Sequence, residues 1–578
     1  MTVAATLLAA TTRHADAVAL RVPAAGGWEQ MRFAELGRAA RALAAGLIGL
    51  GVEPGDRVAI LGATRPEWTL ADLGALCAGA VVVPVYHTNS AAECEYVLAH
   101  AGARVVICED AAQVAKVDGV RERLPELEHV ITMEQVAGRR SLSGLGAGHG
   151  DDGVGAAIAA VSRDDVATIV YTSGTTGPPK GCELTHANLL ATARMYESVV
   201  TLGPGAVIFM FLPLAHALAR VVQLVALETG ATLSFWSRDP ARLLDDLGAA
   251  EPTHFPSVPR VFEKIHTRAL AAGEDGPAIR RRLMRWALRT GAAASSDPSP
   301  SPWSRAQHRL ADRLVLQKVR NLFGGSLQLA LTGAAPIAED VLAFFDACGI
   351  PVLEGYGLTE TCAAATLNPF GAARFGTVGR ALPGADVRIA DDGEVLLRGP
   401  MVFRGYRADQ DATATSRRGD WLCTGDVGSL DPDGYLSITG RKKDLIITSS
   451  GKNIAPANLE SALRESRWIG EAVVLGDGRP YLVALLTLDP DEIPALAARL
   501  GLDPDLRRMA GDPRVRAAVG AAVGDVNASV ARIEQIKRFA ILDEELTQDE
   551  GELTPTLKVK RAAVAARFAD RIAGLYAQ

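Results

Sequence analysis

The sequence lacks several features that would set it apart from ordinary globular enzymes. No uninterrupted apolar run among the 578 residues approaches the ~18 residues that a membrane-spanning helix needs. The seven cysteines stand singly, without a C-x-x-C pair, which argues against a disulfide framework and a zinc site. The first ten residues carry no basic side chain, so a secretory signal is not indicated. We therefore expect a cytoplasmic protein, with peripheral contact at the inner membrane face as a further option.

An excess of positive charge is also lacking, because 60 Lys and Arg stand against 67 Asp and Glu and the formal net charge is -7. This balance argues against nonspecific nucleic-acid binding, so no nucleic-acid partner is expected, and an anionic substrate has to be attracted by local cations. A G-x-S-x-G elbow is missing as well, which sets aside an α/β-hydrolase. What is present is core material: 48% of the residues are hydrophobic, and the length predicts at least two domains.

The order of patterns predicts how the chain is organised. Helical stretches alternate with short β-branched runs in the first part, which is typical of an α/β domain with buried strands; these runs lie at 58–61, 81–85 and 105–107. A Gly-rich passage, 141–155, is interpreted as a surface connection. After Gly384 the pattern changes to short alternating strands with tight turns. We predict an N-terminal domain over 1–440 and a C-terminal domain over 441–578.

A basic helix is predicted from Pro277 to Arg289, ahead of a Ser/Pro-rich segment at 294–304. Its apolar face is small and its basic run is short. We favour a solvated helix and loop packed on the domain, and contact with a membrane surface is the alternative.

One loop is the most informative stretch for function. The run Tyr171–Gly181 follows a predicted strand, 166–171, and combines glycines, hydroxyls and one lysine. Glycines let several backbone amides face one anion, hydroxyls add donors and lysine adds a mobile charge, so the loop is equipped to hold a polyphosphate. It is not a Walker A loop, because Pro179 and Gly181 flank the lysine, and a solvated turn is the alternative. The candidate phosphate ligands are Thr172, Ser173, Gly174, Thr175, Thr176, Gly177 and Lys180.

Further motifs give this loop its context. The chain carries, in order, the loop 171–181, Pro213–His216, Gly333–Pro336, Glu354–Thr361, Thr424–Asp426, Gly440–Ile446 and Pro555–Lys558. With these motifs the chain resembles the adenylate-forming superfamily almost from end to end. Within that superfamily it is similar to the long-chain fatty acyl-CoA synthetases, a likeness carried by 65–68, 258–264 and 554–558.

The resemblance implies a fold and a reaction. The fold is α/β (α+β overall): a large adenylation domain of several subdomains, with β-sheets flanked by helices and a small β region, and a small mobile α+β C-terminal domain. In the reaction a long-chain fatty acid carboxylate attacks the α-phosphorus of ATP to give acyl-AMP and pyrophosphate, and the thiol of CoA then displaces AMP. Mg2+ is the implied metal, because phosphoryl transfer depends on charge neutralisation and alignment.

The family motifs also assign roles around the nucleotide. Tyr356 is expected to stack on adenine and Asp426 to accept hydrogen bonds from the ribose hydroxyls, assisted by Arg441. A plain turn is the alternative reading of Asp426, and a solvated cation that of Arg441. Gly333, Ala334 and Ala335 are expected to line the adenine pocket, and Glu354, Gly355 and Gly357 are further cofactor-binding candidates.

The reacting groups are assigned in the same way. Glu360 is the metal ligand, Thr359 contacts a phosphate and His216 lies at the carboxylate end of the acyl site. Lys558 matches the mobile lysine that bridges the acyl carboxylate and ATP. The tail departs from the commoner Ser/Thr-Gly-Lys form, which leaves Lys560 as a substitute, and Lys443 occupies the hinge position.

Three functions stay open at this point. The first is a long-chain fatty acid–CoA ligase. The second is an acyl-AMP ligase that loads the phosphopantetheine of a carrier protein, and the third is a nucleotide-binding homologue without turnover. The third is disfavoured, because a sensor has no chemical need for the full set of charged residues.

Overall fold

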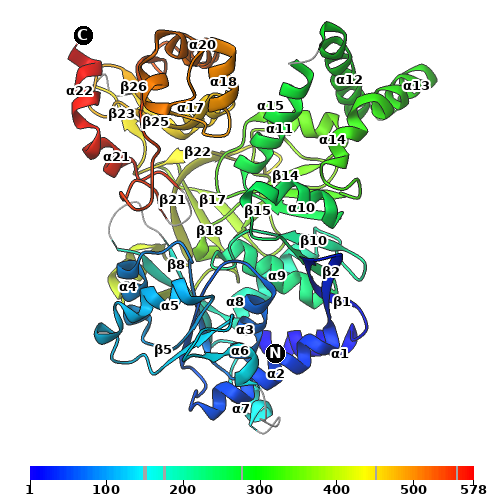
Figure 1. Ribbon diagram of the computed structural model, residues 1–578, viewed down its shortest axis with the longest axis vertical. Helices are drawn as coiled ribbons and strands as arrows, with labels where there is room; N and C mark the ends of the chain where they lie inside the picture. The colour runs from blue at the N-terminus through cyan, green and yellow to red at the C-terminus, as the bar shows by residue number, and fades with distance from the viewer. Residues whose placement is uncertain are drawn as a thin grey trace.

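The computed structural model describes residues 1–146, 153–172, 178–274, 277–297, 299–449, 452–554 and 558–577. These residues form two large mixed sheets, a smaller antiparallel sheet and a separate C-terminal unit (Figure 1). The C-terminal unit has apolar clusters of its own between Ile446 and Phe568. A large N-terminal and a small C-terminal domain are therefore confirmed, while the predicted boundary after Gly440 stays a prediction.

The first large sheet carries the phosphate-loop hairpin. Its central strands are parallel and buried, as their β-branched sequences predict, and β8 and β9 add an antiparallel hairpin at one side. In sheet order the strands are β19 (Gly405–Tyr406), β9 (Lys180–Thr185), β8 (Val166–Thr172), β4 (Val81–Val85), β3 (Arg57–Leu61), β5 (Ala103–Cys108), β6 (His129–Thr132) and β7 (Arg140–Ser141).

The second large sheet places the adenine-side motifs. Its strands from β14 to β1 run parallel, so their carboxyl ends meet at one edge. In sheet order they are β16 (Arg380–Ala381), β15 (Thr366–Leu367), β14 (Val352–Tyr356), β13 (Leu329–Thr332), β12 (His254–Ser257), β10 (Val207–Met210), β11 (Thr232–Phe235), β1 (Val18–Ala24) and β2 (Gly27–Arg32).

Helices cover both sheets, and one apolar cluster extends between the sheets through the packed helices α2, α3, α8 and α9. The helices of this part are α1 (Val3–Arg13), α2 (Phe33–Gly49), α3 (Pro66–Cys77), α4 (Ala91–Ala101), α5 (Ala111–Asp118), α6 (Leu142–Leu145), α7 (Val154–Ala160), α8 (His186–Glu197), α9 (Ala217–Thr229), α10 (Leu243–Ala250), α11 (Pro259–Glu274) and α15 (Glu339–Ala347). At the described start of the Gly-rich passage, Leu142 and Leu145 of α6 are buried against α2, so this end is more structured than a surface connection.

The small antiparallel sheet follows, and it leads into the C-terminal domain. Its strands are β17 (Asp386–Ile389), β18 (Glu394–Arg398), β20 (Arg417–Arg418), β21 (Trp421–Leu430) and β22 (Leu436–Arg441), with helix α16 (Gln410–Thr415). The C-terminal elements are β23 (Ile446–Ile447), β24 (Asn453–Ile454), α17 (Pro456–Arg464), β25 (Ile469–Leu475), β26 (Leu482–Leu488), α18 (Ile493–Leu500), α19 (Leu506–Gly511), α20 (Pro513–Ser529), β27 (Ile536–Ile541), α21 (Arg561–Arg567) and α22 (Ala569–Ala577).

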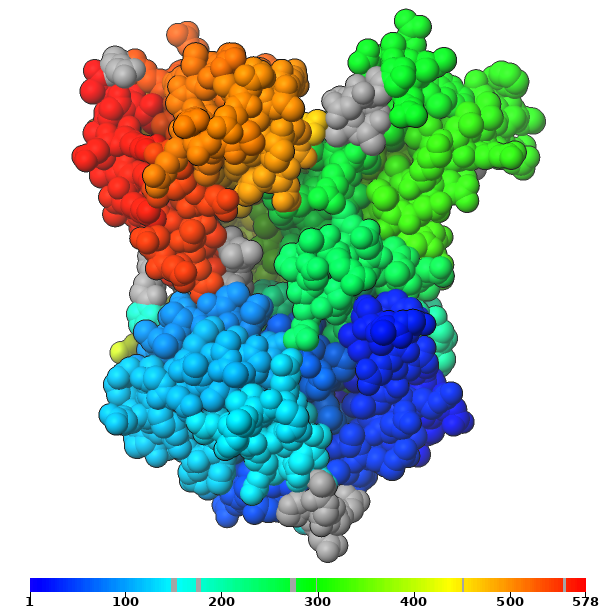
Figure 2. Space-filling view, viewed as in Figure 1, coloured from blue at the N-terminus to red at the C-terminus, as the bar shows by residue number. Residues whose placement is uncertain are grey.

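The predicted basic helix is α12 (Ala278–Ser296), and it is followed by α13 (Pro302–Ala311), a π-helical turn (Asp312–Leu316) and α14 (Gln317–Asn321). Helix α12 packs against α15, but α12 and α13 project from the body of the molecule (Figures 1 and 2). Within the described part of the chain, no helix is both long and apolar enough to cross a bilayer.

Candidate functional site

Three predicted nucleotide residues meet where the second large sheet adjoins the small antiparallel sheet. The Tyr356 hydroxyl donates a hydrogen bond to Asp426 Oδ2 at 2.7 Å, and Arg441 Nε donates to Oδ1 at 2.8 Å. Asp426 is 6% exposed, whereas Arg441 keeps 47% of its side chain exposed. The carboxylate of this pair is therefore buried, while the cation beside it stays partly open to solvent.

The strand register explains why these residues meet. Asp426 and Arg441 are direct cross-strand partners on β21 and β22, which brings opposite charges together. Asp426 thus lies inside a strand, so the plain-turn alternative for it does not hold. Tyr356 ends β14, whose carboxyl end faces the same place.

Close backbone packing shapes the predicted adenine pocket. A Cβ on Gly333 would stand 2.8 Å from the carbonyl oxygen of Gly355, and one on Gly357 would stand 2.0 Å from that of Ala363. Glycine is required at both positions, because no side chain fits there. Ala334 and Ala335 follow as exposed residues, and Ala334 has a φ of 70°.

A row of polar side chains crosses the carboxyl ends of three neighbouring strands. Ser257, Thr332 and Glu354 are partners in register on β12, β13 and β14, so their side chains share one face. Burial, aided by the charge of Glu339, raises the pKa of Glu354 to about 8, so this carboxyl is neutral at pH 7 and keeps a proton to donate. The hydroxyls of Ser257 and Thr332 are buried and have no partner among the described residues. Sequence reasoning missed both, because a Ser or Thr at a strand end gives no signal.

The predicted metal ligand has a partner that the sequence did not reveal. Tyr406 donates its hydroxyl to Glu360 Oε1 at 2.7 Å, and Lys180 Nζ lies 5.0 Å from the centre of the Tyr406 ring. Burial and the Glu360 charge raise the pKa of Tyr406 far above its usual value, so the hydroxyl keeps its proton. Strand β19 pairs with β9 at Cys182, which fixes Tyr406 beside the phosphate-loop hairpin. Tyr406 therefore connects Glu360 with Lys180.

The phosphate loop closes the β8–β9 hairpin. Thr172 and Lys180 are cross-strand partners at its base. The candidate ligands between them, Ser173, Gly174, Thr175, Thr176 and Gly177, lie outside the described residues. Thr359 and Glu360 share a short 3-10 turn whose backbone is tied to the segment between β18 and β19, since Phe403 N–H donates to the Glu360 carbonyl at 2.8 Å.

His216 begins helix α9 and is neutral at physiological pH. Burial, together with the cation of Lys558, lowers its pKa to about 4. Its Nδ1 accepts a hydrogen bond from Leu218 N–H at 3.2 Å, so the ring proton resides on Nε2, which is free to donate. Arg220, one helical turn further along, is buried in an ion pair with Asp72 and is structural.

Lys558 of the C-terminal domain reaches this same region. Burial by surrounding protein and the Arg441 cation lower its pKa, and Asp426 opposes the shift. Lys558 nevertheless keeps solvent-accessible surface. Lys560 is the N-cap of α21, and its backbone N–H donates to the Glu552 carbonyl at 2.7 Å.

The predicted hinge follows an anchored residue. Lys442 Nζ donates to Asp392 at 2.7 Å and to Glu394 at 2.9 Å, which ties the residue after β22 to the turn between β17 and β18. Lys443 comes next, in an exposed turn. Backbone rotation at this position would therefore move the C-terminal domain alone.

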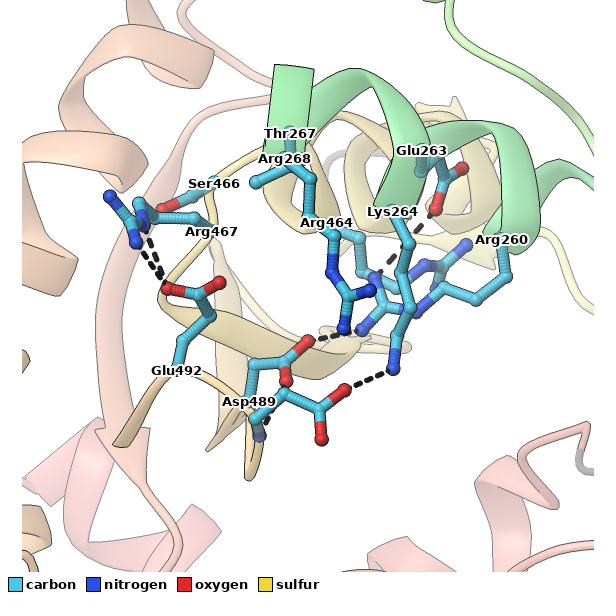
Figure 3. A pocket seen from close by; sticks show the side chains of 11 residues that line it. Arg260, Glu263, Lys264, Thr267, Arg268, Arg464, Ser466, Arg467, Asp489 and Glu492 are labelled. Atoms are coloured by element: carbon cyan, nitrogen blue, oxygen red, sulfur yellow. Dashed lines mark hydrogen bonds and ion pairs between the residues drawn. The ribbon is translucent and has the colours of Figure 1, made fainter. Parts of the chain in front are cut away.

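The two domains also meet at a polar contact away from the nucleotide residues, here called the interdomain contact (Figure 3). Arg260 of α11 pairs with Asp489 at 2.8 Å, and Lys264 pairs with Asp491 at 2.7 Å. Glu465, at the end of α17, lies on the same side: burial and the charges of Asp340 and Glu263 raise its pKa to about 7.

The fold and these residues define a two-domain nucleotide enzyme, and comparison with known proteins identifies its class. The model of the AMP-binding enzyme family matches residues 7–407, and that of the AMP-binding enzyme C-terminal domain matches residues 443–578. The chain belongs to the AMP-binding enzyme family.

Two individual relatives are more specific than the family as a whole. The chain is 40% identical to long-chain-fatty-acid–CoA ligase FadD15 of Mycobacterium tuberculosis, over 95% of this chain and 93% of the relative. It is 31% identical to peroxisomal long chain acyl-CoA synthetase 7 of Arabidopsis thaliana, over 96% of this chain and 82% of that protein.

Solved structures share the fold at lower identity. The adenylation domain of a carboxylate reductase from Mycobacterium chelonae superposes with a TM-score of 0.80 at 21% identity, covering 100% of this chain and 91% of that chain. ATP-bound MatB from Rhodopseudomonas palustris gives a TM-score of 0.71 at 24% identity, covering 99% of this chain and 100% of that chain. The predicted fold class is confirmed.

Proposed function

We propose that the protein is a long-chain fatty acid–CoA ligase that forms acyl-AMP and pyrophosphate from ATP and then acyl-CoA and AMP. The observation that supports the proposal is electrostatic: the charge of Lys558 acts on His216, and the charges of Asp426 and Arg441 act on Lys558. A lysine from the C-terminal domain would thereby serve the expected acyl and nucleotide sites of the N-terminal domain. The names of the relatives support the long-chain acid and CoA as substrates. Cytoplasmic localisation stays a prediction.

Asp426 has the acceptor capacity that a ribose needs. A carboxylate offers about four lone-pair positions, and Tyr356 and Arg441 use one on each oxygen. The positions left over would accept the 2'- and 3'-hydroxyls, with Arg441 holding the charge in place. Tyr356 would keep its ring for adenine, while Gly333 and Gly357 let the backbone approach the base.

The donor set fits Mg2+ carried in by ATP. Among the described residues no group of three His, Cys, Asp or Glu could hold a metal by itself. Mg2+ in nucleotide enzymes is usually held by one or two carboxylates and by the substrate phosphates. Glu360 would supply that carboxylate, and the bound ion would neutralise phosphate charge. Lys180, Thr172 and Thr359 would contact the phosphates beside it.

The acyl carboxylate would be held between His216 and Lys558. It is ionised at neutral pH and needs no base, and the Nε2 proton of His216 would orient one oxygen. The other oxygen attacks the α-phosphorus, and the bond to the pyrophosphate oxygen breaks. Lys558 would stabilise the negative charge on the reacting oxygens. Because the lysine is partly desolvated, its attraction to a nearby anion is stronger than it would be in water.

The second half-reaction needs Lys558 to leave. A thiol must approach the acyl carbon of acyl-AMP, where the lysine stands during adenylation. Rotation at Lys443 would withdraw the C-terminal domain and admit CoA. The thiol sulfur then bonds to the acyl carbon, the thiol proton is lost to water, and AMP departs with the bonding electrons.

The test is to incubate the protein with ATP, Mg2+ and palmitate and to measure pyrophosphate and thioester with and without CoA. CoA-dependent palmitoyl-CoA is expected. Acyl-AMP formation with a phosphopantetheinylated carrier protein as the only acceptor would establish the carrier-loading alternative, and nucleotide binding without either product would establish a homologue without turnover. Across a series of acids, kcat/KM should rise by up to about fourfold per methylene while the chain is being buried.

A further inference from the structure

The projecting helices α12 and α13 carry a charge opposite to that of the rest of the molecule. Residues 277–320 contain nine arginines and one lysine against two aspartates, which makes +8. The whole chain has a formal charge of -7, so the remaining residues carry -15. Such a separation is an electrostatic feature of one surface and not a property of the whole protein.

Exposed apolar side chains lie on the same projection. Trp303 is 72% exposed, Leu310 53% and Leu314 39%, and Ile279 at the start of α12 is 75% exposed. The spacing i, i+7 and i+11 puts Trp303, Leu310 and Leu314 on one face of the helical segment. Such a stripe of large apolar residues is unusual on a free surface and indicates a binding site.

The apolar stripe is not an unfilled part of the protein core. Ala311, Val315 and Leu316, on another face of the same segment, are buried against the domain. Gly291 of α12 approaches α15 so closely that a Cβ would stand 2.0 Å from the Ala347 carbonyl oxygen. The helices are therefore anchored through one face and present the other outward.

Arginines flank the stripe. Arg305, Arg309 and Arg313 follow one another at i, i+4 and i+8 and are all exposed. Within the described part of the chain, no carboxylate forms an ion pair with any of these three. Their long side chains can bend toward the plane of the apolar stripe while keeping the charge in water.

We propose that this α12–α13 surface docks the protein on an anionic lipid bilayer. Tryptophan and leucine on one face of a helix, with cations beside them, match the boundary between acyl chains and negatively charged headgroups. A second copy of the chain is a poor occupant, because a symmetric contact would bring two +8 surfaces together. Nucleic acid would use the arginines but would leave Leu310 and Leu314 exposed to water.

The surface lies on the domain that holds the nucleotide residues, beside α11 of the interdomain contact (Figures 1 and 2). Docking through it leaves the C-terminal domain free to move. A long-chain acid dissolved in the bilayer would then be available to the bound enzyme, but lipid binding itself does not depend on the proposed function.

The test is cosedimentation of the full-length protein with vesicles of phosphatidylglycerol and phosphatidylcholine, against vesicles of phosphatidylcholine alone. Binding is expected only to the anionic vesicles and should weaken as salt rises from about 0.05 to about 0.5 M. The triple variant Arg305→Gln, Arg309→Gln, Arg313→Gln should bind about 100-fold more weakly, on the scale of about fivefold for each arginine. Trp303→Ser should weaken binding about tenfold at unchanged charge.

The control is the triple variant Arg38→Gln, Arg163→Gln, Arg532→Gln, which removes the same charge from exposed positions elsewhere. It should bind anionic vesicles within about twofold of the unchanged protein. Equal losses in both triple variants would overturn the proposal, as would equal binding to neutral vesicles. Binding to duplex DNA, or self-association through Trp303, without vesicle binding would likewise overturn it.

Discussion

The nucleotide residues and the interdomain contact are both built from charged pairs, yet they differ in burial and in origin. Asp426, Tyr356 and Arg441 belong to one domain, and the carboxylate among them is 6% exposed. Lys264 and Asp491 belong to different domains and keep 44% and 56% of their side chains exposed. The first group is preorganised for a ligand, whereas the second holds two movable parts together.

This difference predicts how each region responds to change. Removing one partner of a buried hydrogen-bonded charge leaves the other unsatisfied, which is costly. Exposed ion pairs contribute about 0–1 kcal/mol and are screened by salt. Substitutions near the nucleotide should therefore change the chemistry, and substitutions at the interdomain contact should change the balance between two domain arrangements.

Lys558→Ala is expected to have the largest effect, because Lys558 belongs to the C-terminal domain but is proposed to act at the nucleotide. Adenylation should slow by about 100-fold or more, the scale for removing one transition-state charge contact. Thioester formation from supplied acyl-AMP should be spared. Single-turnover assays of the two half-reactions measure this, with Lys560→Ala alongside. Equal losses in both half-reactions would refute the domain movement, and a larger adenylation loss in Lys560→Ala would shift the assignment to Lys560.

Tyr406→Phe tests preorganisation within one domain. The change removes only the hydroxyl that holds Glu360 and keeps the ring beside Lys180. About fivefold slower adenylation is expected, the scale of one hydrogen bond of about 1 kcal/mol. The apparent Mg2+ requirement should rise with it, which titration of pyrophosphate formation against Mg2+ measures. Tyr435→Phe, which removes a hydroxyl bonded to the Ala372 carbonyl, is the control. An unchanged Mg2+ requirement would contradict a role for Tyr406 in placing Glu360.

Tyr406 also shows where prediction from sequence ends. Strands β3, β4 and β8 were predictable, because short buried β-branched runs have few alternatives. Tyr406 lies on a two-residue strand paired with a hairpin more than two hundred residues earlier, and no local pattern records such a pairing.

The same holds for the charged residues. Asp426 and Arg441 are 15 residues apart and lie opposite each other on two consecutive strands. Their contact therefore follows from a local motif. Arg260 and Asp489 are separated by 229 residues and meet only through the arrangement of two domains. The exposed apolar stripe that begins on α13 was not predicted for a different reason. Helix α13 begins inside a Ser/Pro-rich stretch, and such a composition is typical of a loop.

The double variant Arg260→Ala, Lys264→Ala tests the interdomain contact. It removes both ion pairs from α11 without touching the nucleotide residues. Adenylation should slow by about two- to fivefold, on the scale of about 1 kcal/mol for an exposed ion pair such as Lys264–Asp491. Thioester formation from supplied acyl-AMP should be unchanged or faster. The ratio of the two rates should lose its dependence on salt, and a salt dependence equal to that of the unchanged protein would show that these pairs do not hold the domains.

The smallest expected effect is that of Glu465 on the interdomain contact. Its sign follows from the direction in which the pKa of Glu465 is shifted. Its pKa is raised from 4.5 to about 7 by burial and by the charges of Asp340 and Glu263 across the contact. The contribution of Glu465 to the contact is therefore fully present below pH 4.5 and is lost as the pH rises through about 7. Energy transfer between dyes on the two domains should show the domains separating over this range. Glu465→Gln, which stays neutral, should flatten the profile, whereas Glu492→Gln, which removes a carboxylate paired with Arg467 within the C-terminal domain, should leave its midpoint in place. A midpoint that survives Glu465→Gln would assign the titration to another group.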